Sequence, residues 1–291
     1  MSSKCYQTLI SKPFITIKSI RSTYRKQLAS IYPKHEIDAI LKILCEDLLG
    51  WSKSDFILKD SEELLVKETF LLQDALTELL KSKPVQYITG VAHFYGHVFN
   101  VSEHTLIPRQ ETEELVHLII QEHKSTAPRI LDIGSGSGCI AISLALGLPK
   151  SQVAAIDISN KALEIAQKNA SVLKAAIDFE QVDILKATSI DFYDIVVSNP
   201  PYVRDLEKAE IHANVLEHEP HSALFVANDD ALIFYRHILQ LAKPHLKTIV
   251  YFEINQYLGA EMLELAHSLD FKAMLHKDLN GNDRMMKCWQ D

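Results

Sequence analysis

The chain has 291 residues and a formal net charge of −8 at neutral pH, and 47% of its residues are hydrophobic and 23% charged. This is the composition of a globular protein with one large domain or two ordinary ones. The acidic balance disfavours a general nucleic-acid binder, because phosphate contacts require lysine and arginine. No apolar run approaches the roughly 18 residues that span a bilayer, so we expect no membrane attachment.

Residues 1–35 hold seven lysines and arginines and no acidic residue. With its serines, this stretch has some features of an organellar transit peptide, which leaves an organellar location open. The apolar positions Ile17, Ile20, Tyr24 and Leu28 recur at helical spacing, which favours a helix packed on the protein body. The basic face of this helix is then available to an acidic or nucleic-acid partner.

Residues 1–83 are expected to form a small all-helical domain. After the first helix, a second apolar stripe starts at Ile37 and ends near Gly50. A short helix over 54–58 and a longer one over 61–80 follow.

Residues 84–107 are rich in aromatic and β-branched residues and are interrupted by Gly90 and Gly96, which predicts a β-hairpin linker. Over residues 108–291, strand and helix patterns alternate, which predicts an α/β domain with a mainly parallel sheet. The expected strands are 129–133, 153–157, 178–182, 194–198, 248–253, 271–276 and 284–289. The expected helices are 111–123, 138–147, 160–173, 230–243 and 257–268.

Four cysteines, Cys5, Cys45, Cys139 and Cys288, are scattered without a Cys-x-x-Cys pair. This spacing indicates a reducing compartment and disfavours a zinc site or a disulfide framework. We therefore expect a cytoplasmic protein.

The first strand of the α/β domain ends in a glycine-rich turn, in which Gly134, Gly136 and Gly138 alternate with Ser135 and Ser137. Glycines let the backbone turn tightly and approach a ligand closely. The spacing G-x-G-x-G differs from the G-x-G-x-x-G of an NAD site, which remains the alternative. The turn is similar to the nucleoside site of class I methyltransferases, which use S-adenosylmethionine and release S-adenosylhomocysteine.

Acidic residues follow the next two strands. Asp157 ends the second strand, where a carboxylate can accept both hydroxyls of a ribose. After the third strand, Asp183 is placed to accept the amine of adenine and Ile184 to pack on its ring. Together with the glycine-rich turn, these residues form the predicted cofactor site.

The fourth strand runs into Asn199, Pro200, Pro201 and Tyr202, at the sheet edge where ligands bind. The prolines remove two backbone donors and stiffen the turn. The Asn199 side-chain oxygen and the Pro200 carbonyl can hold both hydrogens of an amide and aim its nitrogen at a methyl donor, so Asn199 is also expected to border the donor. They stabilise positive charge that grows on nitrogen, and Tyr202 offers a flat face. The pattern resembles methyltransferases that act on adenine N6, cytosine N4 or glutamine.

Several motifs, in their order and joint presence, resemble one family, the peptide chain release factor glutamine-N5 methyltransferases. They are PVQYITG at 84–90, FYG at 94–96, LIPRQETEELV at 106–116, NPPYV at 199–203, EHEPHSAL at 217–224 and DLNGNDRMM at 278–286. The resemblance spans about residues 15–290. It implies a Rossmann-like class I methyltransferase domain with a seven-stranded sheet, which follows a helical domain that recognises the substrate.

The resemblance also implies a reaction. The substrate is the glutamine of the Gly-Gly-Gln loop of a bacterial or organellar release factor, which would be held by Asn199, Pro200, Pro201 and Tyr202. The donor would be held by the glycine-rich turn and Asp157. A bacterial cytoplasmic location is the one expected.

Further residues are placed by the same resemblance. Arg109, Glu111 and Glu113 are expected at the mouth of the cofactor site, where they order the entrance. Two positions depart from the family pattern. Gln110 stands where the family usually has proline, and Ile184 stands where some members have an aromatic residue.

Residues 217–221 contain two glutamates and two histidines, but their spacing fits neither a zincin helix nor a zinc finger, so we expect a polar loop and no metal. Two other functions are compatible with parts of this pattern. An adenine-N6 methyltransferase on DNA or RNA shares the Asn-Pro-Pro-Tyr turn, although the acidic charge and the helical front domain disfavour it. A non-catalytic binding factor is disfavoured by the intact Asn199 and Asp157. We expect a monomer.

Overall fold

The computed structural model describes residues 14–204, 208, 213–226 and 230–291. The chain divides into two compact units, residues 1–89 and 90–291. Lys4, Cys5 and Lys12 lie outside the described residues. Within the described ranges, no helix is long and apolar enough to cross a membrane.

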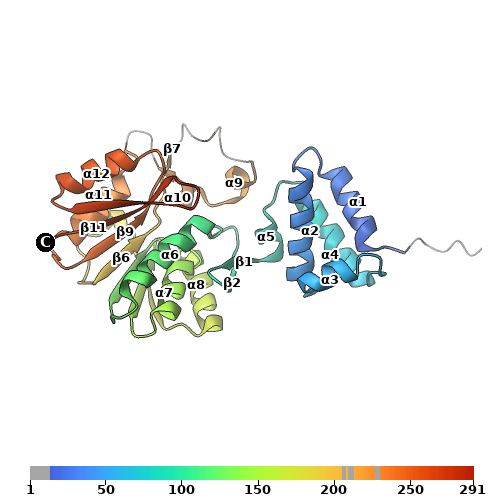
Figure 1. Cartoon of the computed structure of the whole chain (residues 1–291), viewed down its shortest axis with the longest axis horizontal. Coiled ribbons are helices and arrows are strands. Elements are labelled where there is room, and N and C mark those ends of the chain that lie inside the picture. Colours follow the sequence, from blue (N-terminus) through green and yellow to red (C-terminus); the bar gives the residue numbers. More distant parts are fainter. Residues whose placement is uncertain (1–13, 205–207, 209–212, 227–229) are drawn as a thin grey trace, which may run out of the picture. The chain divides into compact units, whose positions relative to one another are not determined.

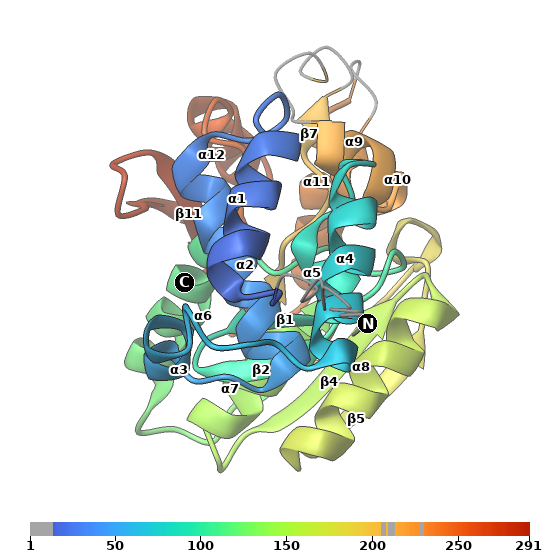
Figure 2. The same ribbon diagram turned by 90° about the vertical axis from the view of Figure 1, so that its right-hand side faces the viewer.

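The described part of the first unit is helical, as the sequence predicted (Figure 1). Its helices are α1 (Ile17–Gln27), α2 (Lys34–Leu49), α3 (Lys53–Leu58), α4 (Val66–Leu79) and α5 (Val85–Thr89). Helices α1, α2 and α4 lie side by side (Figures 1 and 2). Their apolar stripes meet in one core, in which Tyr24, Leu41 and Leu72 are buried. The helical spacing of these residues explains why the stripes face each other.

The basic face of α1 is partly used inside this unit. Arg21 forms an ion pair with Asp60 at 2.6 Å, and Arg25 forms one with Asp38. A partner of this face therefore meets fewer free cations than the sequence suggested.

The expected hairpin over 84–107 is shorter in the structure. Residues 85–89 form helix α5, because the Tyr87 amide donates to the Pro84 carbonyl and Val85 is buried in the helical core. The hairpin consists of β1 (Val91–Phe94) and β2 (His97–Asn100). Its two-residue loop, Tyr95 and Gly96, has positive φ at both positions, as a type I′ turn requires.

The second unit contains a seven-stranded sheet with the strand order β10-β11-β9-β6-β3-β4-β5. Its strands are β3 (Arg129–Ile133), β4 (Gln152–Asp157), β5 (Ile177–Gln181), β6 (Ile195–Ser198), β9 (Ile249–Glu253), β10 (Lys272–Lys277) and β11 (Asp283–Trp289). The pairs β3–β4, β4–β5, β3–β6 and β6–β9 are parallel, and β11 is antiparallel to both of its neighbours. This confirms the mainly parallel Rossmann-like sheet expected from the sequence.

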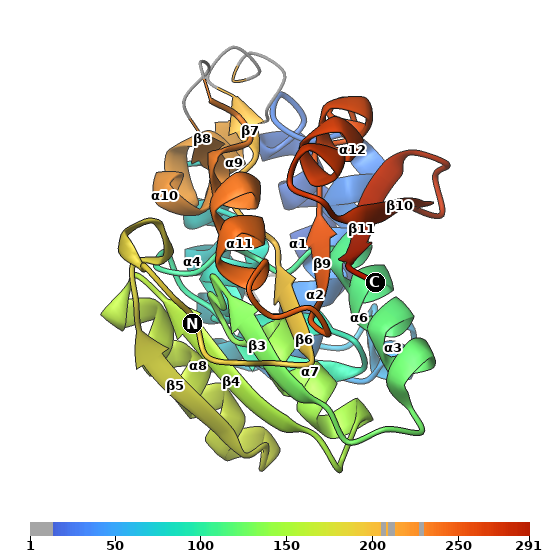
Figure 3. The ribbon, with the colours of Figure 1, turned by 90° about the vertical axis from the view of Figure 1, so that its left-hand side faces the viewer.

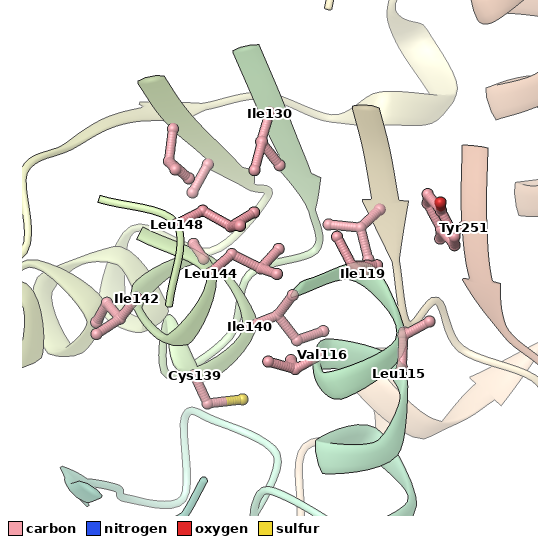
Figure 4. Close-up of a cluster of buried hydrophobic side chains, with 14 of the residues drawn as sticks. Leu115, Val116, Ile119, Ile130, Cys139, Ile140, Ile142, Leu144, Leu148 and Tyr251 are labelled. Atoms are coloured by element: carbon pink, nitrogen blue, oxygen red, sulfur yellow. The ribbon is translucent and has the colours of Figure 1, made fainter. Parts of the chain in front are cut away.

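Helices cover both faces of this sheet (Figure 3). They are α6 (Gln110–His123), α7 (Cys139–Gly147) and α8 (Asn160–Leu173) on one face, and α11 (Ile233–Ala242) and α12 (Gly259–Ser268) on the other. Figure 4 shows side chains of α6 and α7, such as Ile119 and Leu144, directed toward Ile130 of β3. This packing holds the start of α7, and with it the glycine-rich turn, against the sheet.

Short elements complete the second unit. They are η1 (Ile184–Lys186), β7 (Val203–Arg204), α9 (Ala213–His218), α10 (His221–Leu224) and β8 (Phe225–Val226). Strands β7 and β8 pair in parallel, apart from the large sheet.

Candidate active site

A cavity of about 470 Å³ opens at the carboxyl ends of β3, β4 and β6. The chain leaves β3 for β4 and β5 on one side and later returns to β6 on the other, so the strand order reverses at β3. Open α/β sheets bind ligands at such a reversal. Residues of the segment 103–106, of η1, of α10 with the preceding Pro220, and of α11 contribute to the remaining walls.

The glycine-rich turn forms one wall. Gly134 and Gly136 line the cavity, and a Cβ on either glycine would meet no atom within 4 Å. The backbone is therefore open to a ligand at these two positions. Ser135, Ser137 and Gly138, the other predicted members of the site, are buried and are not among the described lining residues. Gly138 serves as the N-cap of α7.

Asp157 ends β4 and lines the cavity. One carboxylate oxygen accepts from the Gly136 amide at 2.8 Å and the other from the Ser159 amide at 2.9 Å. Each oxygen retains a lone pair, so the carboxylate can accept further hydrogen bonds from two hydroxyls. The two backbone bonds also fix its position relative to the glycine-rich turn.

The wall after β5 combines apolar and acidic groups. Ile184 and Asp183 line the cavity together with Ile156, Ile158 and Phe234. Asp183 accepts from the Leu185 amide at 3.1 Å. A hydrogen bond from Lys186 holds the pKa of the Asp183 carboxyl below its ordinary value. The wall can therefore cover a flat apolar ring and accept from a donor on its edge.

Asn199, Pro200 and Pro201 line the cavity opposite Asp157, at the carboxyl end of β6. The Asn199 Nδ2 donates to Thr112 Oγ1 of α6 at 3.3 Å. Tyr202 is not among the described lining residues. Its hydroxyl donates to Glu253 at 3.2 Å, so the stacking expected of its ring stays a prediction.

Two carboxylates that no sequence motif marked as functional support this region. Glu253, at the end of β9, is 1% exposed and accepts from Thr112 at 2.6 Å. Burial raises the pKa of Glu253, while the bonds from Thr112 and Tyr202 and the charge of Arg284 oppose this rise. A charged residue at the carboxyl end of a buried strand was the available signal for it.

The second carboxylate, Glu219, orders the entrance segment. It is 3% exposed and binds the Arg109 guanidinium at 2.5 Å and the Ile107 amide at 3.2 Å. Of the predicted polar loop 217–221, only Glu219 and Pro220 lie between helices α9 and α10, and Glu219 ties Arg109 to its place before α6. Glu113 instead accepts from the Tyr95 amide at 2.8 Å, at the hairpin turn, and does not line the cavity among the described residues.

Known proteins match both units. Residues 20–90 match the PrmC N-terminal domain, and residues 110–226 match the methyltransferase small domain. A release factor glutamine methyltransferase from Flavobacterium psychrophilum is 49% identical over 284 residues, which cover 93% of this chain and 98% of the relative. The chain belongs to the release factor glutamine methyltransferase family. Another member of this family, from Bacteroides thetaiotaomicron, is 43% identical and covers 92% of this chain and 98% of its own length.

Solved structures with the same fold have low identity. The hMettl16 catalytic domain, in complex with hairpin 6 of the MAT2A 3′UTR, has a TM-score of 0.52 and 17% identity and covers 73% of this chain and 91% of that one. A methyltransferase from Pyrococcus furiosus has a TM-score of 0.50 and 14% identity, over 75% and 100% of the two chains. Both likenesses concern the fold alone.

Membership of the release factor glutamine methyltransferase family confirms the resemblance that the sequence motifs indicated. It makes the chain an S-adenosylmethionine-dependent protein glutamine methyltransferase, in place of the NAD alternative. The relatives from Flavobacterium and Bacteroides are bacterial.

Proposed function

We propose that the chain methylates the side-chain amide nitrogen (N5) of the glutamine in the Gly-Gly-Gln motif of peptide chain release factors. The observation that carries the proposal is the position of the Asn199-Pro200-Pro201 turn, which lines the same cavity as Gly136 and Asp157. The groups proposed to hold the substrate amide and those proposed to hold the donor therefore line the same cavity. The name of the relatives supports the class of substrate.

The cavity wall fits S-adenosylmethionine in its chemistry. The open backbone at Gly134 and Gly136 would admit the donor, Asp157 would hold its ribose hydroxyls, and the apolar wall with Asp183 and Ile184 would hold adenine. S-adenosylmethionine supplies an electrophilic methyl group on a positively charged sulfur, and S-adenosylhomocysteine remains after transfer.

The Asn199 turn acts on the substrate amide. An amide nitrogen is a poor nucleophile because its lone pair is delocalised into the carbonyl group. The Asn199 side-chain oxygen and the Pro200 carbonyl accept its two hydrogens and hold the nitrogen in one orientation. Both acceptors stabilise the positive charge that develops on nitrogen. The proton leaves after the methyl group has arrived, so a strong base is not required.

The shape of the substrate segment favours a peptide loop, because a Gly-Gly-Gln loop is slimmer than a flipped base. We propose that the protein acts as a monomer. The proposed location is the bacterial cytoplasm, where release factors act.

The experiment is methyl transfer to a purified release factor, followed by mass spectrometry of the Gly-Gly-Gln peptide. For Asn199→Ala we expect kcat to fall by about 100-fold or more, because one acceptor of the substrate amide is lost. Donor affinity, measured by calorimetry, is expected to stay within about threefold, because Asp157 and the apolar wall remain.

Two controls accompany this assay. A release factor whose motif glutamine is replaced by glutamate is expected to accept no methyl group. Adenine-containing oligonucleotides are expected to stay unmodified as well. Transfer to the oligonucleotides but not to the release factor would replace the proposal by an adenine-N6 methyltransferase.

A further inference from the structure

A chain of hydrogen bonds connects the Asn199 turn to the buried carboxylate at the end of β9. Thr112 Oγ1 donates to Glu253 Oε2 at 2.6 Å, and the Tyr202 hydroxyl donates to Glu253 Oε1 at 3.2 Å. Asn199 Nδ2 donates to Thr112 Oγ1 at 3.3 Å. Thr112 is 2% exposed and Glu253 is 1% exposed, so little water competes for these contacts.

The number of hydrogens fixes the direction of this chain of bonds. A carboxylate only accepts, so both hydroxyls give their hydrogen to Glu253. A threonine hydroxyl has one hydrogen, and Thr112 can therefore only accept from Asn199. Asn199 must face Thr112 with its NH2 group, which leaves its oxygen for another donor.

We propose that Glu253, acting through Thr112, orients the Asn199 carboxamide so that its oxygen rather than its NH2 group is presented to the substrate amide. Neither Glu253 nor Thr112 is among the described residues that line the cavity, so both are positioning residues. The inference rests on the proposed function, because the substrate amide supplies the hydrogen that the Asn199 oxygen accepts. In the opposite orientation two NH2 groups would meet and the substrate hydrogen would lose its acceptor.

Several elements place titratable or polar groups around Glu253. They are Thr112 and Glu111 of α6, Cys139 of α7, Tyr202 after β6, Tyr235 of α11 and Arg284 of β11. Arg284 and the two hydroxyl donors favour the carboxylate, while burial and Glu111 oppose it. A protonated Glu253 would donate to Thr112, which would reverse the bonds and turn the Asn199 oxygen away from the substrate.

The kinetic test uses the full chain, S-adenosylmethionine and a release factor with an intact Gly-Gly-Gln motif. Thr112→Val removes the acceptor of the Asn199 NH2 group and is expected to lower kcat by about 10- to 100-fold, with KM for the release factor within about threefold. Thr112→Ser retains the hydroxyl and is expected to restore kcat to within about threefold.

Thr248→Val is the matched control for a merely structural effect. Thr248 is 1% exposed, and its hydroxyl donates to the Tyr193 carbonyl at 2.6 Å, away from the cavity wall. Its removal is expected to lower stability and leave kcat unchanged. A wild-type kcat in Thr112→Val, or no rescue by Thr112→Ser, would overturn the inference.

The pH dependence of kcat tests Glu253 directly. The wild type is expected to lose kcat on the acid side as Glu253 takes up a proton. Glu253→Gln cannot titrate and offers Thr112 either an acceptor or a donor, so we expect a lower kcat without the acid-side loss. An acid-side loss of the same size in Glu253→Gln would contradict the proposal.

A measurement that needs no methyl transfer separates this inference from the proposed function. With 15N-labelled asparagine, a side-chain NH2 proton of Asn199 is expected at a downfield, hydrogen-bonded NMR shift in the wild type. It is expected to move upfield in Thr112→Val and to return in Thr112→Ser. If the wild type failed to methylate the release factor, the proposed function would fall while these shifts still supported the orientation. A shift that is unchanged in Thr112→Val would overturn the orientation itself.

Discussion

Burial of the Asp132 carboxyl, near the end of β3, affects the stability of the folded state. It is fully buried, and its Oδ2 accepts from the Ala141 amide at 3.1 Å, while its Oδ1 has no hydrogen-bond partner among the described residues. Burial raises the pKa of Asp132 from 3.8 to about 7. An ionised Asp132 therefore destabilises the folded state.

This residue predicts a pH dependence of stability. Below about pH 4 the folded and unfolded states both hold the proton, and between about pH 4 and 7 only the folded state keeps it, so stability falls as the pH rises. Asp132→Asn keeps an acceptor for Ala141 without the titration. We compare the unfolding free energy of Asp132→Asn with that of the wild type at each pH. This difference is expected to favour the variant by about 2–3 kcal/mol more near pH 8 than near pH 5.

Urea unfolding at the two pH values measures this difference. Asp178→Asn, the same change at an exposed position of β5, is the control and is expected to show no such difference. Equal pH dependence in Asp132→Asn and the wild type would refute the expectation.

Single residues differ in how far the sequence revealed them. A local pattern could predict that Asp157 and Asn199 lie at the cavity, because Asp157 ends a strand and Asn199 directly follows one at the ligand-binding edge. The contact between Thr112 and Glu253 joins positions 141 residues apart, and nothing local in either segment encodes it. Supporting contacts of this kind require the assembled fold.

At the scale of elements, the turn between β3 and α7 brings the backbone of Gly138 into close contact with residues of α7 and α8. Gly138 has a φ of +79°, and a Cβ there would lie 3.0 Å from Ile142 Cδ1 and 3.1 Å from Ala166 Cβ of α8. Alanine at this position therefore combines backbone strain with crowding between two helices. The third glycine of the turn serves helix packing rather than the cavity wall.

A pair of variants separates strain from crowding. Gly281 has a φ of +85°, and a Cβ there would meet no atom within 4 Å, so Gly281→Ala is expected to cost about 1–2 kcal/mol from strain alone. Gly138→Ala is expected to cost about 1–3 kcal/mol more, because its neighbours must move. Thermal unfolding of the two variants measures the difference, and equal losses would contradict the packing role.

The long elements of the second unit were predictable within one to three residues, because buried parallel strands and amphipathic helices have strong periods. Helix α5 was not, since its β-branched residues favour a strand and only its packing in the helical core determines the outcome. Strands β7 and β8 have two residues each, which is too short for a period to appear.

For the whole molecule, the division into two units predicts which elements donor binding stabilises. The described lining residues of the cavity all belong to residues 90–291. A ligand that binds the folded state at about 100 times its Kd stabilises that state by about 2.7 kcal/mol. We expect S-adenosylhomocysteine to slow hydrogen exchange in β3, β4 and β6 and to leave α1, α2 and α4 unchanged.

Hydrogen exchange measured by mass spectrometry, with and without S-adenosylhomocysteine, checks this expectation. Asp157→Ala serves as the control, since it is expected to weaken the ligand-dependent protection of the second unit. Protection of equal size in α1, α2 and α4 would show that the two units respond to the donor as one.

The corner formed by Asn199 and Pro200 also bears on how many methyl groups each glutamine receives. Its two acceptors suit a primary amide, which has two hydrogens to share. The monomethylated product has one hydrogen left, and its new carbon would press against an oxygen that has lost its donor. If Asn199 and Pro200 hold the amide as proposed, we expect the product to leave the corner after one turnover and each glutamine to carry a single methyl group.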